Sequence, residues 1–281
     1  MKLQYLGTAA AEGIPALFCK CATCTEARKR GGRNIRTRPQ AIVDGKLLID
    51  FNADTYMHVL QNGIDLADVR HCLITHTHSD HFYPEDIGMR RPGFSSLGTS
   101  EEERFNLYGS HGAMLKLRGY LSSKSFEADY YSLNPLKPYE ENKVGDYTVI
   151  PLESVHDVHA SPFFYLIKGP DGKTLLYAHD THYFSDKVWE YLEKEKPRID
   201  FASLDCTSAA TPLMTYIGHM NLNDNKKAKN KLIKIGCADE TTVFCCNHFS
   251  HNGENVLYEE FSMLAKKKGF ITSYDGMTVE F

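Results

Sequence analysis

The chain has 281 residues, of which 42% are hydrophobic and 24% are charged. This composition is typical of a globular protein with a large buried core. The formal net charge of −4 argues against a surface adapted to nucleic acid in general or to anionic membranes. No apolar run approaches the roughly 20 residues of a membrane-spanning helix, and the first residues lack the apolar centre of a secretory signal. We therefore expect a cytoplasmic protein with reduced cysteines.

Short runs rich in β-branched and aromatic residues recur along the whole chain and predict at least ten strands. Asp44-Gly45 separates two of them and is a favoured two-residue hairpin turn. In chain order the runs are KLQYLGT, QAIVDGKLLIDFN, HCLIT, FNLYG, YTVIPLE, PFFYLIKG, KTLLYAHD, DFASLD, TTVFCCN and FITSYDGMTVEF.

Helical periodicity is found in residues 54–62, 185–196, 223–235 and 254–268. Three of these segments end at a glycine, which is typical of a helix C-terminus: Gly63, Gly236 and Gly269. Strands dominate the first half of the chain and alternate with helices in the second. The pattern therefore predicts one α/β domain over residues 1–281, in which two sheets pack face to face with helices outside.

Two segments do not fit a regular pattern. Residues 26–39, EARKRGGRNIRTRP, are the one strongly basic stretch, and they predict a solvated, mobile loop. Residues 91–143 include PGFSSLGTSEEER and SKSFEADYYSLNPLKPYEENK. We expect an insertion or lid there rather than a separate domain.

Three histidines and an aspartate lie within six residues in HTHSDH, directly after the predicted strand HCLIT. In an extended loop His76 and His78 would point to the same side, and Asp80 and His81 can then turn back toward them. Imidazoles and carboxylates bind divalent transition metals, and so many of them together are difficult to explain by core packing. The motif predicts ligands for two divalent cations.

Three further candidate ligands each follow a predicted strand, as HTHSDH does: His156, Asp180 and His248. Strand ends that share one edge of a sheet bring their side chains together. A carboxylate such as Asp180 can bridge two cations, and a pair of cations lowers the pKa of a shared water enough to give hydroxide near neutral pH. His159 is an alternative to His156, which we prefer because it is closer to the strand end.

The sequence FCKCATC places Cys19, Cys21 and Cys24 in a C-x-C-x2-C arrangement. Three thiolates so close together would repel one another or oxidise unless a cation held them. The pattern therefore predicts a structural Zn²⁺ that needs a fourth ligand. The other five cysteines lie in or beside apolar strands or a helix end and are expected to be buried: Cys72, Cys206, Cys237, Cys245 and Cys246.

HTHSDH resembles the H-x-H-x-D-H signature of the metallo-β-lactamase fold hydrolases, and the three later ligands follow in that family's order. The resemblance implies a four-layer αβ/βα sandwich with a dinuclear site at one edge of the sheets. It implies one metal held by His76, His78 and His156, and a second held by Asp80, His81 and His248. Asp180 would bridge the two metals.

The turn GTAAAEGIP followed by C-x-C-x2-C is similar to the phosphonate-pathway cyclic-phosphate phosphodiesterase branch of that family. In this branch a histidine three residues after the last active-site histidine completes the structural zinc, which implies His251 here. His219 in IGHMN matches the branch's catalytic histidine and would protonate a leaving oxygen, although it could also serve only to cap the helix that follows. The segment YPEDIGMRRPGF is longer than its counterpart, so the cyclic ribosyl substrate is not carried over.

Together these residues predict a dinuclear metal-dependent hydrolase, a phosphodiesterase in which a metal-bound hydroxide attacks a small phosphate diester, cyclic or open. The expected catalytic residues are His219, Asp80 and Asp180. The expected cofactors are two Zn²⁺, Mn²⁺ or Fe²⁺ ions in the active site and one structural Zn²⁺. We expect a small phosphodiester as the partner and neither nucleic acid nor a membrane, and a homodimer stays open.

Three alternatives remain. A tRNA-processing endonuclease of the same fold would need a basic RNA-binding surface, and a lactone or ester hydrolase would use the same metals. A carrier protein like that of the quinone-biosynthesis branch, held together by a structural metal ion, would share the cysteine motif but would not be an enzyme. The carrier is disfavoured because its dinuclear site is often degraded, whereas all seven candidate ligands are present here.

Overall fold

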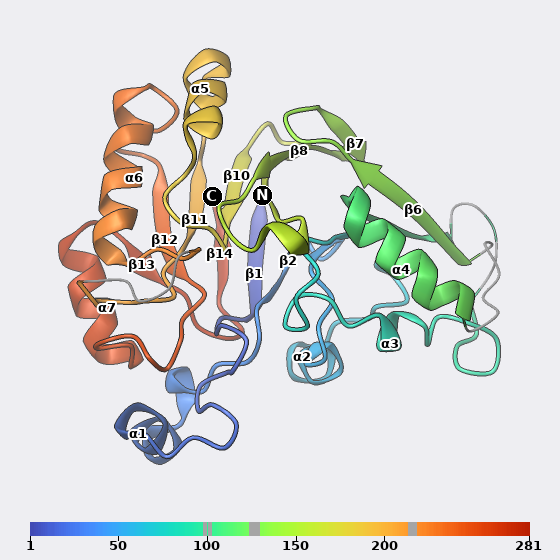
Figure 1. The fold of residues 1–281 in the computed structure, drawn as a ribbon, viewed down its shortest axis with the longest axis horizontal. Coiled ribbons are helices and arrows are strands. Elements are labelled where there is room, and N and C mark those ends of the chain that lie inside the picture. The colour runs from blue at the N-terminus through green and yellow to red at the C-terminus, as the bar shows by residue number, and fades with distance from the viewer. Residues whose placement is uncertain (98–99, 101–102, 124–129, 213–217) are drawn as a thin grey trace.

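Two seven-stranded β-sheets pack face to face, with helices on their outer surfaces (Figure 1). The computed structural model describes residues 1–97, 100, 103–123, 130–212 and 218–281. This arrangement confirms the predicted four-layer αβ/βα sandwich. None of the described helices is both long and apolar enough to cross a bilayer.

The first sheet is built mainly from the N-terminal half of the chain and has a C-terminal strand at one edge. Its strands, in spatial order, are β14 (Thr278–Glu280), β1 (Lys2–Gly7), β2 (Gln40–Val43), β3 (Leu47–Ile49), β4 (His71–Leu73), β5 (Phe105–Ser110) and β6 (Tyr131–Leu136). The second sheet contains β13 (Ile271–Thr272), β12 (Val243–Asn247), β11 (Phe201–Asp205), β10 (Thr174–Ala178), β9 (Phe163–Lys168), β8 (Tyr147–Glu153) and β7 (Asn142–Val144).

The helices cover the two outer faces. On the side of the first sheet lie α2 (Thr55–Asn62), α3 (Pro84–Ile87) and α4 (His111–Ser123), and on the side of the second lie α5 (Asp186–Glu195), α6 (Leu222–Lys234) and α7 (Tyr258–Lys267) (Figure 1). Helix α1 (Ala22–Arg30) projects below both sheets in that view. Among the described residues, Gly32–Asn34 and Val158–Ala160 each form a short 3-10 helix.

Alternating side chains of single strands explain why both faces of each sheet are covered. In β10, Leu175 and Tyr177 belong to the core between the sheets, while Leu176 belongs to the core under α5 to α7. In β3, Leu47 faces the other sheet and Leu48 faces the outer helices. Because successive side chains of a strand point to opposite faces, strands that are apolar throughout need a layer on both sides.

Parallel pairing brings many strand ends to one edge of the molecule. Strands β3 to β6 are parallel to one another, as are β10 to β13. The loops that follow β3, β4, β10, β11 and β12 therefore leave from the carboxyl ends of parallel strands. This edge is where sites on such sheets form.

All ten predicted runs contain strands, and the four predicted helices match α2, α5, α6 and α7 within a few residues. The five cysteines predicted to be buried are buried. The prediction for residues 26–39 is wrong for most of the segment: α1 extends through Arg30, and the guanidinium of Arg36 is buried and donates to Thr8 Oγ1 and the carbonyl of Ser273 at 2.8 Å each.

The prediction for residues 91–143 also needs correction, although part of that segment lies outside the described residues. The described part contributes β5, α4 and β6 to the first sheet and its outer layer, so it is not an irregular insertion. Gly112 and Gly119 interrupt the helical pattern of α4, and Pro135 lies in β6, at the edge of the sheet, where proline is tolerated. These residues concealed both elements from pattern reasoning.

Candidate metal centre

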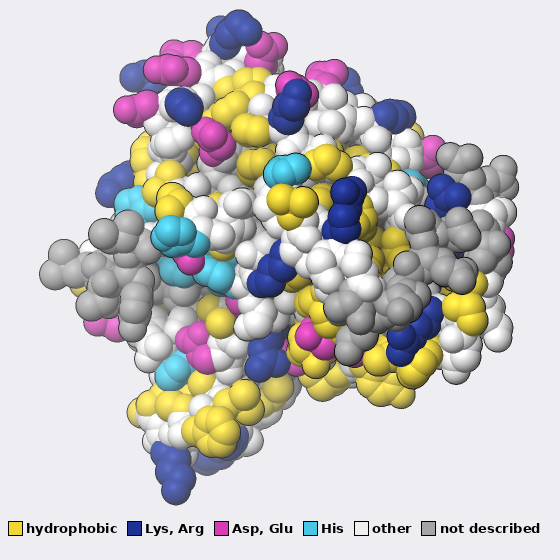
Figure 2. Space-filling model, turned by 45° about the vertical axis from the view of Figure 1, so that its right-hand side comes forward, with side chains coloured by type: hydrophobic (Ala, Val, Ile, Leu, Met, Phe, Trp, Pro, Cys, Tyr) yellow, Lys and Arg dark blue, Asp and Glu magenta, His cyan; other side chains and the backbone are white. Residues whose placement is uncertain are grey.

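The candidate ligands meet at the edge where parallel strands of both sheets end. His76, His78, Asp80 and His81 lie in the loop between β4 and α3, and Asp180 and His248 follow β10 and β12. Figure 2 shows histidine side chains gathered on one face of the molecule with an acidic side chain among them.

Three residues of this edge have a left-handed backbone. The φ angles are 66° at Asp50, 49° at Asp180 and 65° at His248. Residues other than glycine seldom adopt this conformation, and where they do the strain is often tied to function. The hydroxyl of Ser154 donates to the carbonyl of Asp180 and helps to hold that residue in place.

The first group of ligand atoms comes from His76, His78 and His156, which lie within 4.8 Å of one another. His156 Nε2 is 3.2 Å from His78 Nδ1. His159 is exposed in the adjacent 3-10 helix and lies outside the ligand groups found among the described residues. The geometry therefore favours His156 over His159.

The second group comes from Asp80, His81 and His248, again within 4.8 Å of one another. Asp180 lies between the two groups. Its Oδ2 is 2.7 Å from His81 Nε2 and 3.0 Å from His248 Nε2, while its Oδ1 is 3.7 Å from His156 Nε2. One oxygen of Asp180 thus faces each group, as a bridging carboxylate requires.

The polar atoms at the centre of the site fit divalent cations. His76 Nε2 is buried and has no hydrogen-bond partner among the described residues, while the buried His81 Nε2 and His248 Nε2 converge on one oxygen, Asp180 Oδ2. A buried polar atom without a partner is costly. Imidazole nitrogens and carboxylate oxygens that converge in this way are ligands that suit Zn²⁺, Mn²⁺ or Fe²⁺.

Charge is distributed in the site as a cation would require. Burial alone would lower the pKa of His81, but the carboxylates of Asp180, Asp80 and Asp50 raise it well above the usual value. Burial would raise the pKa of Asp180, yet His248 and His81 hold it well below its usual range. The carboxylate of Asp180 therefore stays ionised, and the proton on His81 lies where a metal ion would otherwise supply the positive charge.

Asp50 is a functional candidate that sequence reasoning missed. Its Oδ2 accepts a hydrogen bond of 2.7 Å from His81 Nδ1, and its Oδ1 accepts one from the backbone N–H of Thr75. The carboxylate fixes the tautomer and orientation of His81, which leaves Nε2 free to bind a metal. Asp50 ends the run KLLID, so the strand-end position that pointed to Asp180 was a usable signal here as well.

Sequence reasoning also missed Asp205, which lies at the end of β11. Its Oδ2 is 2.9 Å from His219 Nδ1, and its Oδ1 accepts hydrogen bonds from the backbone N–H groups of Thr207 and Met220 at 3.0 Å each. His219 Nδ1 is also 3.8 Å from Asp180 Oδ1, so the histidine lies at the metal centre. The buried Asp205 thus orients His219 toward the ligand groups.

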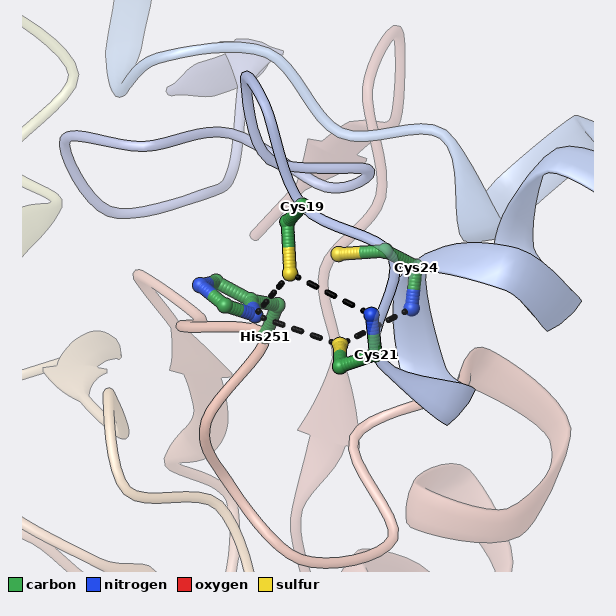
Figure 3. A group of neighbouring side chains, drawn as sticks. All are labelled: Cys19, Cys21, Cys24 and His251. Atoms are coloured by element: carbon green, nitrogen blue, oxygen red, sulfur yellow. Dashed lines mark hydrogen bonds between the residues drawn. The ribbon is translucent and has the colours of Figure 1, made fainter.

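Cys19, Cys21, Cys24 and His251 form a separate cluster beside α1 (Figure 3). Cys19 Sγ and Cys21 Sγ lie 3.6 Å and 3.5 Å from His251 Nδ1. A tetrahedral Zn²⁺ with ordinary bond lengths would separate a sulfur ligand from a nitrogen ligand by about 3.6 Å. The spacing of this cluster therefore fits a zinc ion.

Hydrogen bonds within the cluster favour the thiolate form of Cys21, which is the form that binds a cation. Partial burial opposes ionisation, but the N–H of Cys24 and the ring of His251 lower the pKa of Cys21 to about 6. Burial raises the pKa of Cys24 to about 12. The Cys24 thiol would therefore need a bound cation to ionise at neutral pH. Arg28 donates to the carbonyls of Cys19 and Cys24 and holds the loop against α1.

A single loop connects the two clusters. His248 belongs to the dinuclear group and His251 to the cysteine group. Between them, Phe249 donates to the carbonyl of Thr8 and accepts from the N–H of Ala10, at 2.9 Å and 2.8 Å. The N-terminal loop is therefore anchored next to His248.

The cysteine cluster gives a direct test. We expect Cys21→Ser to remove one bound zinc ion per chain and to lower the melting temperature, because a hydroxyl is a poor zinc ligand. Cys237→Ser is the matched control, since its hydroxyl can keep the bond that Cys237 Sγ makes to the carbonyl of Leu192 at 3.3 Å. Elemental analysis of the purified proteins measures the effect. Equal zinc content in Cys21→Ser and the parent would refute the assignment.

The comparisons with known proteins agree with this architecture. Residues 47–234, more than half of the chain, match the family model described as the beta-lactamase superfamily domain. No curated protein matches the chain.

Among solved structures, a diphosphatase from the PhnP family is 21% identical, with a TM-score of 0.74 over 100% of this chain and 96% of its own. Zn²⁺-bound PqqB from Methylobacterium extorquens is 17% identical, with a TM-score of 0.69 over 100% of both chains. The short form of human tRNase Z is 14% identical, with a TM-score of 0.66 over 100% of this chain and 99% of its own. At such identities the likeness shows a shared fold. On the family match, this chain belongs to the beta-lactamase superfamily and has the metallo-β-lactamase fold of a metal-dependent hydrolase.

Proposed function

We propose that the protein is a dinuclear metal-dependent phosphodiesterase that hydrolyses a small phosphate diester. The observation that carries the proposal is the position of Asp180, whose two carboxylate oxygens face two separate groups of histidine ligands. One solved structure of this fold is named a diphosphatase and another a tRNase, and both names denote hydrolysis of a bond to phosphorus, which supports the proposal at that level.

The grouping of the ligand atoms supports an assignment of residues to each metal. His76, His78 and His156 would hold one cation, and Asp80, His81 and His248 the other. When bound, such a pair of cations supplies Lewis acidity and lowers the pKa of a water molecule. Asp50 would keep His81 in the tautomer whose Nε2 points to the site.

His219 would act as the proton donor to the leaving oxygen. Its Nδ1–H donates to Asp205, which leaves Nε2 as the atom that can face a substrate. Burial alone would lower its pKa, but Asp205 and Asp180 raise the pKa of His219 to about 9, so the ring is cationic at neutral pH. A cationic donor fits an anionic phosphate diester better than a neutral carboxylic ester.

The His156/His159 pair offers a sharp test of the activity. We expect His156→Ala to lower hydrolysis of bis(p-nitrophenyl) phosphate by more than the about 10–100-fold that loss of an outer-shell partner costs. His159→Ala changes the same residue type three positions later, in the exposed 3-10 helix, and should keep the parent rate. A His156→Ala protein that is folded and as active as the parent would exclude the proposed centre.

The pH dependence tests the role of His219. Activity should fall as the pH rises through about 9, because the cationic donor is then lost. Asp205→Asn removes the carboxylate that most raises this pKa, so the alkaline fall in kcat/KM should move to lower pH. The measurement is kcat/KM against pH at equal metal content. If kcat/KM of Asp205→Asn fell at the same alkaline pH as that of the parent, a group other than His219 would control the fall.

A further inference from the structure

A cavity lies on the outer side of the first sheet, next to the loop that carries the HTHSDH motif. Its volume is about 340 Å³, and its wall includes Phe51, Leu66, Phe94 and Phe105. Figure 1 shows α3, which contributes another part of this wall, below α4 and close to α2. Pockets of about 300 Å³ or more with mostly apolar walls are typical of small-molecule sites.

Three phenylalanine rings line the cavity together with other apolar side chains, and its polar side chains are Asp86, Arg90, Ser95 and Ser96. The rings of Phe51 and Phe105 lie edge to face with their centroids 6.3 Å apart. Phe94 is 60% exposed, so a large apolar side chain is open to solvent beside the cavity. A flat aromatic molecule could cover these rings in the stacked and edge-on arrangements that such rings favour.

Two side chains of opposite charge, Arg90 and Asp86, are among those that line the cavity. The Nη2 of Arg90 donates to the carbonyl of Glu103, so the guanidinium is held in place beside the cavity. Asp86, in α3, supplies a carboxylate to the same wall. A ligand with an acceptor for Arg90 and a donor for Asp86 would satisfy both groups.

The cavity is physically connected to the metal centre. The N–H of Phe51 donates to the carbonyl of His81 at 2.9 Å, and the carbonyl of Phe51 accepts from Tyr83 at 2.7 Å. The residue before Phe51 is Asp50, whose carboxylate holds the ring of His81. A molecule that presses on the Phe51 ring would therefore act on the backbone that positions His81.

We propose that this cavity is a second ligand site, distinct from the metal centre, for a small aromatic molecule that carries an anionic acceptor and a hydrogen-bond donor. Its occupancy shifts the metal affinity of the dinuclear site through Phe51 and His81. Coupling between two sites is reciprocal, so metal binding shifts the affinity of the cavity for its ligand by the same factor.

The test uses two fluorescent probes on the full chain. One is 8-anilinonaphthalene-1-sulfonate, which has aromatic rings, a sulfonate and an N–H group. The other is N-phenyl-1-naphthylamine, the same molecule without the sulfonate. Ala67 also lines the cavity. We expect Ala67→Phe, which fills the cavity, to weaken both probes by at least about tenfold.

Three milder substitutions, one of them a control, keep the test independent of any effect of Ala67→Phe on folding. Phe94→Ala should weaken both probes by about three- to tenfold, the loss expected for one aromatic contact. Leu60→Ala is the matched control: Leu60 is 66% exposed, on α2, and does not line the cavity, so its loss should change neither affinity. Arg90→Gln should weaken the sulfonate but not the neutral probe.

Coupling is read from a metal titration of the metal-free protein with and without saturating sulfonate probe. The probe should shift the metal concentration at half-saturation in the parent and in Leu60→Ala, but not in Ala67→Phe. Equal probe affinities in the parent, Ala67→Phe and Phe94→Ala would overturn the cavity as the site. An unshifted midpoint in the parent would overturn the connection to the metal centre. Neither result bears on phosphodiesterase activity, which is measured separately.

Discussion

The structure of the candidate centre depends on one buried carboxylate. Asp180 lies between two groups of imidazoles, with Oδ2 2.7 Å from His81 Nε2 and Oδ1 3.7 Å from His156 Nε2. An ionised carboxylate at this depth is stable only with positive charge close to it. The strand ends, the left-handed backbone at Asp180 and the convergence of both sheets serve to hold that charge and its ligands together.

Two further carboxylates hold histidines of the site in position. Asp50 orients His81 and Asp205 orients His219, each from the end of a strand. The loop from His248 to His251 then connects this edge to the cysteine cluster. Residues that are far apart in sequence therefore lie side by side at this edge, connected by hydrogen bonds.

Much of the fold and the site could be predicted because short motifs carried their own chemistry. HTHSDH, FCKCATC and the strand-end residues were sufficient to choose candidate ligands that the structure brings together, and the apolar runs were sufficient to predict most strands of the two sheets. Helix α1 could not be found because it buries only Cys24 and Ala27 and so lacks a hydrophobic stripe. Asp50 and Asp205 share the strand-end position of Asp180, but only the structure shows that each accepts a hydrogen bond from a histidine of the site.

The most direct measurement is anomalous X-ray scattering from crystals of the protein prepared with Zn²⁺ or Mn²⁺. The account predicts two peaks at the strand edge, one on each side of the Asp180 carboxylate. One would lie among His76, His78 and His156, and the other among Asp80, His81 and His248. A single peak, or metal bound away from Asp180 while these ligands stay unoccupied, would contradict the dinuclear centre and the chemistry derived from it.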